Sequence, residues 1–340
     1  MSDIEFDKFL KTVAAGGKLA IAESSRAFGL IMAGDVSDVR IAAFVTALAV
    51  RKPTIDEIVG ASRAMRSAMT TIEANPYAID LCGTGGDGAG TLNISTACAF
   101  VVSSCGVPVA KHGNRNMSSR SGTADCLEAL GVKIDLGPAE ASRCLREAGL
   151  CFLFAQTYHP AMKHAARVRQ ALGFRTIFNL LGPLSNPARV RRQLIGVYAR
   201  DWVEPLADAL ARLGADRVWV VYGDGLDEIA TSGPTRVAML AEGKVTVREI
   251  GPEDAGLSWS PLSALAGGTA TENAAALKRL LEGETGAYRD IVLINSAAAL
   301  VIGGKVQDLK EGVVLASAAI DDGAAKEKLD ALITISNVRS

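Results

Sequence analysis

The fold of this chain is constrained most by a change of pattern near residue 78. Before that point the sequence reads as helices only, and after it short apolar segments of strand character alternate with helical ones. The expected strands are 78–82, 107–110, 132–134, 150–154, 193–197 and 217–222. Alternation of this kind favours a mainly parallel sheet covered by helices. We therefore expect an α/β fold whose ligands bind beyond the carboxyl ends of the strands.

The residues before this change predict a small helical bundle. Phe6, Leu10 and Val13 share one face of a first helix, and Gly34 is placed to end a second. A capping box over residues 54–57 begins a fourth helix. The third helix should start after Ser37 and turn inward the side chains Val39, Ile41, Phe44 and Leu48.

The chain of 340 residues is long enough for two domains. We expect residues 1–72 to form the helical domain and residues 73–340 to form the α/β domain. The segment 159–187 interrupts the strand–helix alternation and predicts two helices, at 163–172 and 175–181. We expect these helices to join the N-terminal bundle.

Charge and composition exclude several classes of protein. A net charge of -1 argues against bulk attraction to nucleic acid or to an anionic membrane. No apolar stretch is long enough to span a bilayer, and the acidic N-terminus does not resemble a signal peptide. The six cysteines show neither C-x-x-C nor metal-site spacing. We therefore expect a cytoplasmic protein with no nucleic-acid or membrane partner.

A glycine block, residues 83–88, directly follows the first expected strand and contains G-x-G-x-x-G. A dinucleotide site needs an acidic residue about 20 positions further on, but no Asp or Glu lies between Asp87 and Asp125. Glycines also let backbone N–H groups turn toward a phosphate, and Ser95 and Thr96 follow at an expected helix start. The block predicts a phosphate site, although a tight turn without a ligand has the same composition.

A cationic loop, residues 111–115, follows the second expected strand, and a hydroxyl-rich segment, 118–123, comes after it. Cations and hydroxyls are the donors that phosphate recognition needs. A solvated basic turn would explain this loop equally well if it stood alone. Its position after a strand expected to neighbour the glycine-block strand favours a shared site.

An acidic pair, Asp227 and Glu228, stands in a glycine-containing loop after the strand expected at 217–222. Mg²⁺ in enzymes is commonly held by one or two carboxylates together with substrate phosphates. An exposed acidic turn is the simpler explanation of the spacing alone.

Taken together, these strings resemble the anthranilate phosphoribosyltransferase family. The matching segments are 83–87, 93–96, 111–115, 118–119, 122–131, 159–164, 175–183 and 227–228. The similarity extends from the N-terminal helices to the C-terminus. It implies a small N-terminal helical domain on a larger α/β domain of nucleoside phosphorylase/phosphoribosyltransferase type, and a homodimer formed through the helical part. It also implies transfer of a phosphoribosyl group from phosphoribosyl pyrophosphate (PRPP) to anthranilate, in tryptophan biosynthesis.

The resemblance also assigns site residues. PRPP would be bound by Gly83, Gly86, Asp87, Thr91, Asn93, Ile94, Ser95, Thr96, Lys111, Ser118, Ser119 and Thr123. The cofactor Mg²⁺ would be bound by Ser95, Asp227 and Glu228. Anthranilate would be bound by Gly83, His112, Asn114, His159, Arg169 and Pro183. Met117 and Thr123 depart slightly from the family pattern, and neither departure removes a charged contact.

The implied reaction displaces pyrophosphate from C1 of the ribose, so stabilising the leaving group is its main requirement. Mg²⁺, backbone amides and Lys111 would serve this purpose. No residue stands out as a general base. His112 is the best candidate, and we expect it mainly to position the acceptor. His164 is expected to be structural.

Two alternatives share the expected fold. A pyrimidine nucleoside phosphorylase would lack the strings at 114–115 and 175–179 that this chain contains. A non-catalytic, nucleic-acid-binding relative would be markedly basic and would have lost the acidic pair. The sequence favours neither.

Overall fold

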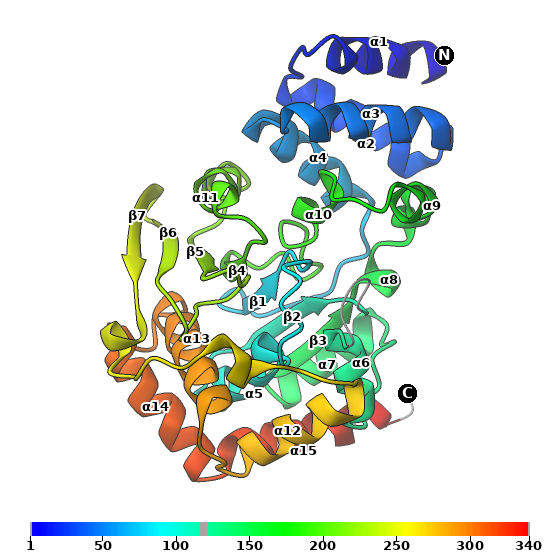
Figure 1. Ribbon diagram of the computed structural model, residues 1–340. Helices are drawn as coiled ribbons and strands as arrows, with labels where there is room; N and C mark the ends of the chain where they lie inside the picture. The colour runs from blue at the N-terminus through cyan, green and yellow to red at the C-terminus, as the bar shows by residue number, and fades with distance from the viewer. Residues whose placement is uncertain (1, 116–120, 339–340) are drawn as a thin grey trace.

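The N-terminal part of the structure is a bundle of helices at one end of the molecule (Figure 1). The computed structural model describes residues 2–115 and 121–338. The bundle consists of α1 (Ser2–Ala14), α2 (Ile21–Ala33), α3 (Asp38–Arg51) and α4 (Ile55–Ala68). The expected capping box begins α4: the Glu57 carboxylate accepts the Thr54 N–H at 2.8 Å, and the Thr54 hydroxyl accepts the Glu57 N–H at 3.3 Å. Gly34 ends α2 with φ 81°, as predicted.

One inward-facing residue of the bundle was predicted wrongly. Val39 is 79% exposed, whereas Ile41, Phe44 and Leu48 are fully buried. The three buried residues repeat at helical spacing along one face of α3, and Val39 lies on the other side of the helix.

A seven-stranded sheet forms the centre of the α/β domain, in the order β3-β2-β1-β4-β5-β6-β7. The strands are β1 (Ile79–Gly83), β2 (Val109–Gly113), β3 (Leu150–Phe154), β4 (Arg192–Gly196), β5 (Arg217–Gly223), β6 (Thr235–Ala241) and β7 (Lys244–Ile250). Strands β1 to β5 are parallel, and β6 and β7 are antiparallel additions at one edge. The predicted mainly parallel sheet is therefore confirmed.

Two features of the sheet differ from the prediction. Residues 132–134 are not a strand but part of the link between α6 and α7, where Val132 and Ile134 are buried as loop residues. The β6–β7 hairpin was not predicted. Its turn is formed by Glu242 and Gly243 with φ values of 51° and 73°, and positive φ at both central positions matches the twist of an antiparallel hairpin.

Helices cover both faces of the sheet. They are α5 (Ile94–Ser104), α6 (Thr123–Ala129), α7 (Pro138–Glu147), α8 (Ala155–Tyr158), α9 (Lys163–Leu172), α10 (Phe178–Leu181), α11 (Val203–Arg212), α12 (Ala270–Leu281), α13 (Ala287–Gly303), α14 (Leu309–Asp321) and α15 (Ala324–Asn337). In the described part of the chain, none of the helices is both long and apolar enough to cross a bilayer.

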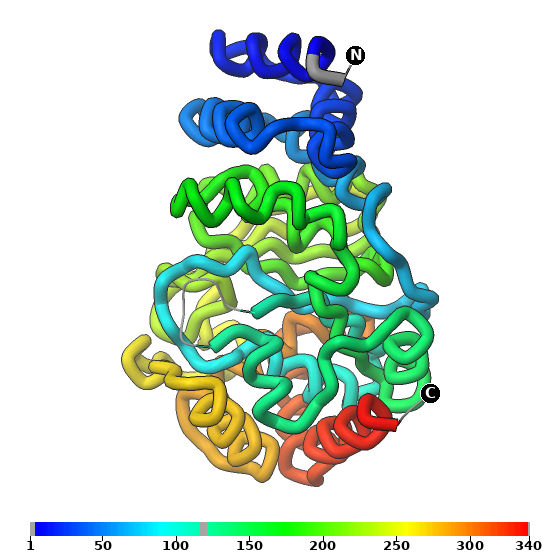
Figure 2. The backbone as a smooth tube through the Cα atoms, turned by 90° about the vertical axis from the view of Figure 1, so that its right-hand side faces the viewer, coloured from blue at the N-terminus to red at the C-terminus, as the bar shows by residue number. Residues whose placement is uncertain are grey.

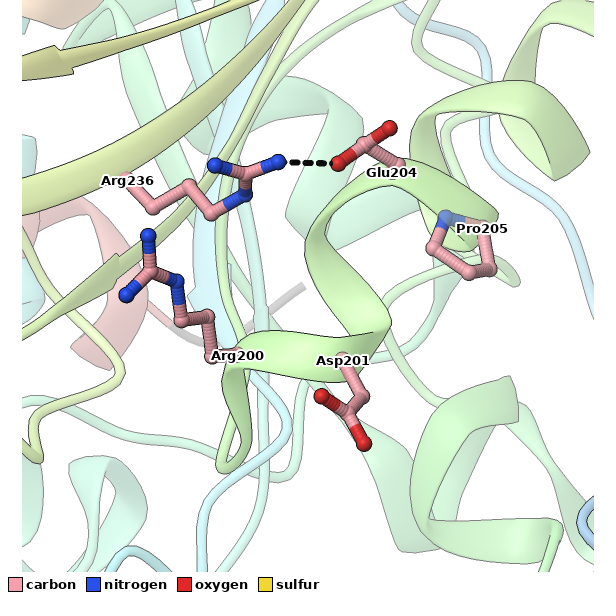
Figure 3. Close-up of a pocket in the computed structure, with 5 residues that line it drawn as sticks. All are labelled: Arg200, Asp201, Glu204, Pro205 and Arg236. Atoms are coloured by element: carbon pink, nitrogen blue, oxygen red, sulfur yellow. Dashed lines mark hydrogen bonds and ion pairs between the residues drawn. The ribbon is translucent and has the colours of Figure 1, made fainter.

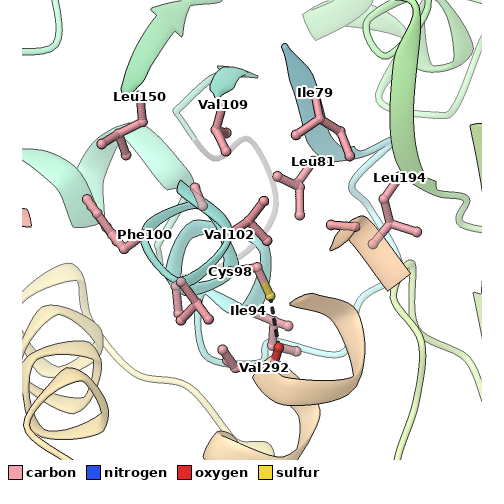
Figure 4. Close-up of a cluster of buried hydrophobic side chains, with 14 of the residues drawn as sticks. Ile79, Leu81, Ile94, Cys98, Phe100, Val102, Val109, Leu150, Leu194 and Val292 are labelled. Atoms are coloured by element: carbon pink, nitrogen blue, oxygen red, sulfur yellow. Dashed lines mark hydrogen bonds between the residues drawn. The ribbon is translucent and has the colours of Figure 1, made fainter. Parts of the chain in front are cut away.

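The first hydrophobic core lies between the sheet and α5, α13, α14 and α15. Figure 4 shows α5 at its centre, where Phe100 and Val102 lie among side chains of the parallel strands, such as Leu81. The Cys98 thiol of α5 donates to the carbonyl of Val292 in α13 at 3.5 Å. This core fixes α5, whose N-terminus faces the carboxyl end of β1.

The second hydrophobic core joins the helical bundle to the opposite face of the sheet. Phe28 of α2, Phe178 of α10, Leu206 of α11 and Val220 of β5 belong to one continuous cluster. Helix α9 packs against α2 and α3, and α10 packs against α4, so the segment after β3 runs beneath the bundle (Figure 2). The helix expected from residue 175 begins only at Phe178.

Candidate active site

Three loops meet at the carboxyl ends of the parallel strands. The glycine loop follows β1, and the acidic loop follows β5. The second expected strand, 107–110, extends further than predicted, so residues 111–113 of the cationic loop form the end of β2 and only Asn114 and Arg115 follow it. Strand β1 pairs with β2 on one side and with β4 on the other, and β4 pairs with β5. The expected pairing of the glycine-block strand with the Lys111 strand is therefore confirmed. The order of the strands brings the three loops to one edge of the sheet.

The glycine loop and the acidic loop are in direct contact. The N–H of Gly85 donates to Oδ2 of Asp227 at 2.8 Å. A Cβ at Gly83 would lie 2.2 Å from the same oxygen, so a side chain there would push the Asp227 carboxylate out of its place. Gly85 itself has φ 64°, in the left-handed region that glycine adopts without strain. These glycines let the loop backbone approach the Asp227 carboxylate closely.

The acidic loop concentrates negative charge. Burial, the nearby Asp87 and a side-chain hydrogen bond with Asp87 raise the pKa of Asp227 to about 7. Burial and repulsion from Asp227 raise the pKa of Glu228 to about 8, against the opposing effect of Lys111. Three carboxylates near one cation form an environment that a divalent cation would stabilise.

The donors around this loop fit Mg²⁺. The backbone N–H of Ser95 hydrogen-bonds Glu228, which places the Ser95 residue beside the carboxylates. Within the described ranges no group of three or more His, Cys, Asp or Glu side chains has metal-binding geometry. A site with two carboxylates and a hydroxyl, completed by substrate phosphates and water, is the arrangement that Mg²⁺ accepts.

Lys111 points from β2 toward the start of α5. Its side chain is 3% exposed, and its Nζ donates to the Leu81 carbonyl and, at 3.1 Å, to the Ser95 hydroxyl. The ammonium group therefore lies close to the N-terminus of α5, beside the acidic pair. A buried cation and a helix N-terminus at one place form an anion-binding environment.

The remaining residues expected to bind PRPP line the same region. The Thr96 hydroxyl lies 3.4 Å from that of Thr123 at the start of α6, and the Asn93 amide oxygen accepts from Asn273 at 2.9 Å. The Ile94 side chain is buried in the core, and its N–H donates to Leu92. The backbone of Thr91 forms an isolated antiparallel β-bridge with that of Ala266. Ser118 and Ser119 lie outside the described residues.

Two buried histidines lie next to one another on the other side of Lys111. The Nε2 atoms of His112 and His159 are 3.2 Å apart, and the rings are 6% and 4% exposed. Burial, followed by the neighbouring His159, lowers the pKa of His112 to about 3. Burial also lowers the pKa of His159 to about 4. Both imidazoles are therefore neutral at pH 7 and can position a ligand without adding charge.

Arg169 and Asn114 are open to a ligand. The Arg169 guanidinium lies 5.9 Å above the Phe178 ring, burial lowers its pKa, and no hydrogen-bonding or ion-pair partner for it occurs in residues 2–115 or 121–338. Asn114 is exposed at the end of β2. Arg115, by contrast, turns to α6 and pairs with Asp125 and Glu128. Pro183 is buried, and its carbonyl accepts from Gln193 at 2.9 Å.

Three residues that support the site, Asp80, Asn186 and Arg175, were assigned no role from the sequence, although Arg175 lies in the matching segment 175–183. Asp80, fully buried in β1, accepts the His112 N–H at 3.0 Å and the Asn186 side-chain amide at 2.8 Å. Arg175 contacts the Gly86 carbonyl and lies 4.5 Å above the Tyr198 ring. For Asp80 and Asn186, an aspartate within an apolar strand was the only signal, because the partners are distant in sequence.

A surface cavity of about 480 Å³, shown in Figure 3, contains none of the expected site residues in its lining. It is lined by Arg200, Asp201, Glu204, Pro205 and Arg236. Arg236 pairs with Glu204, and Arg200 pairs with Glu249. Its cations are already neutralised, so this cavity is a poor anion site.

Comparisons with known proteins agree with this geometry. The glycosyl transferase family, helical bundle domain, matches residues 7–69, and the glycosyl transferase family, a/b domain, matches residues 75–326. The anthranilate phosphoribosyltransferase of Rhizobium meliloti (strain 1021) is 55% identical over 337 residues, which cover 99% of each chain. That of Rhodopseudomonas palustris (strain HaA2) is 54% identical over 334 residues, which cover 98% of this chain and 99% of the relative.

Solved structures extend the likeness. Anthranilate phosphoribosyltransferase from Thermus thermophilus is 42% identical, with a TM-score of 0.93, over 97% of this chain and 99% of that one. The Saccharomyces cerevisiae enzyme, solved in complex with PRPP and Mg, is 28% identical, with a TM-score of 0.88, over 97% of both chains. With two family domains matched in order and relatives aligned along nearly its whole length, the chain belongs to the anthranilate phosphoribosyltransferase family.

Proposed function

We propose that this protein transfers the phosphoribosyl group of PRPP to the amino group of anthranilate and releases pyrophosphate. The observation that carries the proposal is the meeting of Lys111, the N-terminus of α5 and the Asp227–Glu228 pair at one edge of the sheet. A cation, the N-terminus of a helix and a site for Mg²⁺ at one place suit a pyrophosphate leaving group. The relatives named for this reaction support the assignment of the acceptor.

The residues of the donor side have distinct roles in this reaction. The glycine loop supplies backbone N–H groups, and Lys111 places positive charge where negative charge develops on the leaving group. Ser95, Asp227 and Glu228 would hold Mg²⁺, which supplies Lewis-acid stabilisation of the departing pyrophosphate when bound. Thr96 and Thr123 offer hydroxyl donors to the ribose phosphate.

The acceptor side orients an amine that needs little activation. Arg169 would pair with the anthranilate carboxylate, and Asn114, His112, His159 and Pro183 would line its ring. The histidines remain neutral at pH 7, so their role is orientation. Positioning of this kind can contribute roughly 7 kcal/mol or more to catalysis.

We also propose a homodimer, the two-domain division at residue 72, and a cytoplasmic location. The helical bundle exposes Ile4 (78%), Val39 (79%) and Val50 (82%) on α1 and α3, and apolar surface of this kind suits association between copies. All six cysteines are free thiols, as is usual in a reducing compartment. Sedimentation at several concentrations tests the dimer.

The decisive experiment follows the loss of anthranilate fluorescence with PRPP, with and without Mg²⁺. The proposal requires turnover that depends on both PRPP and Mg²⁺. A parallel reaction with thymidine and phosphate should release no base. Release of thymine together with unchanged anthranilate would overturn the proposal in favour of a nucleoside phosphorylase.

A further inference from the structure

Arg66, in the last turn of α4, is a partly buried cation that the proposed reaction does not use. Its Nε donates to the carbonyl of Leu184 at 2.6 Å, and its Nη1 donates to the carbonyl of Leu213 at 3.3 Å. Burial, with a further effect of Arg189, lowers the pKa of the guanidinium to about 10. No carboxylate in the described part of the chain pairs with it. Desolvating a cation that only carbonyls compensate is unfavourable, so its two contacts need an explanation.

The contact with Leu213 is explained by the stability it gives to the end of α11. Leu213 follows the last turn of α11, where carbonyls lack helical partners and the helix dipole favours a cation. The other contact leads to the active site. Leu184 lies between Pro183 and Ser185, in the link from α10 to β4.

The backbone of this link faces both buried histidines. The backbone of Gly182 lies close enough to the His112 ring to raise its pKa, and the backbone of Ser185 has the same effect on His159. The link is held from the sheet side by Gln193, which donates to the Pro183 carbonyl at 2.9 Å. Arg66 holds the link from the side of the helical bundle. The orientation of both imidazoles therefore depends on a segment that is fixed between Gln193 and Arg66.

We propose that Arg66 is a positioning residue for the anthranilate side of the site, which acts by fixing the Leu184 carbonyl so that His112 and His159 face the acceptor. It touches neither substrate. The identity of the acceptor rests on the proposed function, but the arrangement of the imidazoles can be measured without any substrate. Arg66 therefore connects the helical bundle to the part of the active site that the α/β domain carries.

The test compares Arg66→Met and Arg66→Lys with the wild type. The chain has 3 histidines, so long-range ¹H–¹⁵N spectra of protein labelled at histidine resolve each ring and its tautomer. Arg66→Met should alter two of the three ring patterns. It should also raise the KM for anthranilate about tenfold, the scale of one hydrogen bond from a charged group, and leave the KM for PRPP within about twofold. Arg66→Lys keeps one cationic donor, so its KM for anthranilate should lie between those of the wild type and Arg66→Met.

Arg212→Ala is the matched control. Arg212 also joins α11 to α4, through an exposed ion pair with Asp56 at 2.6 Å, but it does not contact the link. It should leave the ring spectra and both KM values unchanged. Millimolar guanidinium added to Arg66→Ala should lower its KM for anthranilate, which a general loss of stability would not allow.

Two results would overturn the proposal. One is an Arg66→Met variant with wild-type ring spectra and wild-type KM for anthranilate. The other is an Arg66→Met variant in which the KM for anthranilate, the KM for PRPP and the Tm all change together, while Arg66→Lys restores none of them. If Arg66→Met does not fold, Arg66→Lys carries the same comparison. A wild type that ignores anthranilate would refute the proposed function, while the ring spectra would still decide the role of Arg66.

Discussion

Lowering the pH from 7 to 5 should destabilise this protein through one pair of side chains, His112 and His159. Their folded-state pKa values, about 3 and about 4, lie below the ordinary value of 6.5. Unfolded chains therefore take up protons first as the pH falls below 6.5. The stability that the pair contributes is fully present above pH 6.5 and is lost as the pH falls toward 4.

The size of the effect follows from the proton count. At pH 5 both rings are still neutral in the folded state, 1.5 pH units below the unfolded value of 6.5. At about 1.4 kcal/mol per pH unit, each ring lowers the free energy of unfolding by about 2 kcal/mol, and the pair lowers it by about 4 kcal/mol. Both rings are nearly inaccessible to solvent, so no discount for screening applies. Asp227 and Glu228, whose pKa values are raised, act in the opposite direction.

The assay isolates the histidines by difference. Urea unfolding is measured at pH 7, 6 and 5 for the wild type and for His112→Gln combined with His159→Gln. The variant starts less stable, but its loss between pH 7 and pH 5 should be smaller than that of the wild type by about 4 kcal/mol. His164→Gln, which replaces the histidine outside the pair, should keep the wild-type difference. Parallel losses in the wild type and the double variant would refute the reasoning.

The other predictions concern substrate and metal. Asp227→Asn with Glu228→Gln should lower turnover by at least about a hundredfold, and addition of Mg²⁺ should not restore it; full recovery at high Mg²⁺ would contradict the assignment. Arg169→Ala should raise the KM for anthranilate about ten- to hundredfold, the range for a lost charge-assisted contact, and a change confined to the KM for PRPP would place Arg169 elsewhere. Arg175→Ala should raise the KM for PRPP only about threefold, because the exposed contact to Gly86 is weakened by solvent; isothermal titration with PRPP checks this, and unchanged affinity would show that the contact does not hold the loop.

Local signals in the sequence predicted local structure well. The capping box over residues 54–57 and the glycine that ends α2 depend only on near neighbours, and both are confirmed. Residues 132–134 were wrongly predicted as a strand because the buried link contains apolar side chains, as a buried strand does. The β6–β7 hairpin was missed because its outer strand is largely exposed and lacks an apolar run, and because Glu242-Gly243 is not one of the usual two-residue turn pairs.

Much of the candidate site was predictable because its loops follow strand ends. Its support was not, because the partners are far apart in the chain. Asn186 reaches Asp80 across 106 positions, and Arg66 reaches Leu184 across 118. Nothing in the local sequence marks either pair. Such contacts become visible only when the fold brings the segments together.

The second core has a consequence for engineering this enzyme. Because the bundle packs on α9, α10 and α11 within a single apolar interior, an excised α/β domain would present the apolar faces of these helices to water, including Phe178, which contacts Phe28 of α2. We expect that fragment to aggregate rather than fold alone. Exchanging bundles between relatives, as a route to new acceptors, would therefore require the contacting faces of α9, α10 and α11 to be redesigned with them.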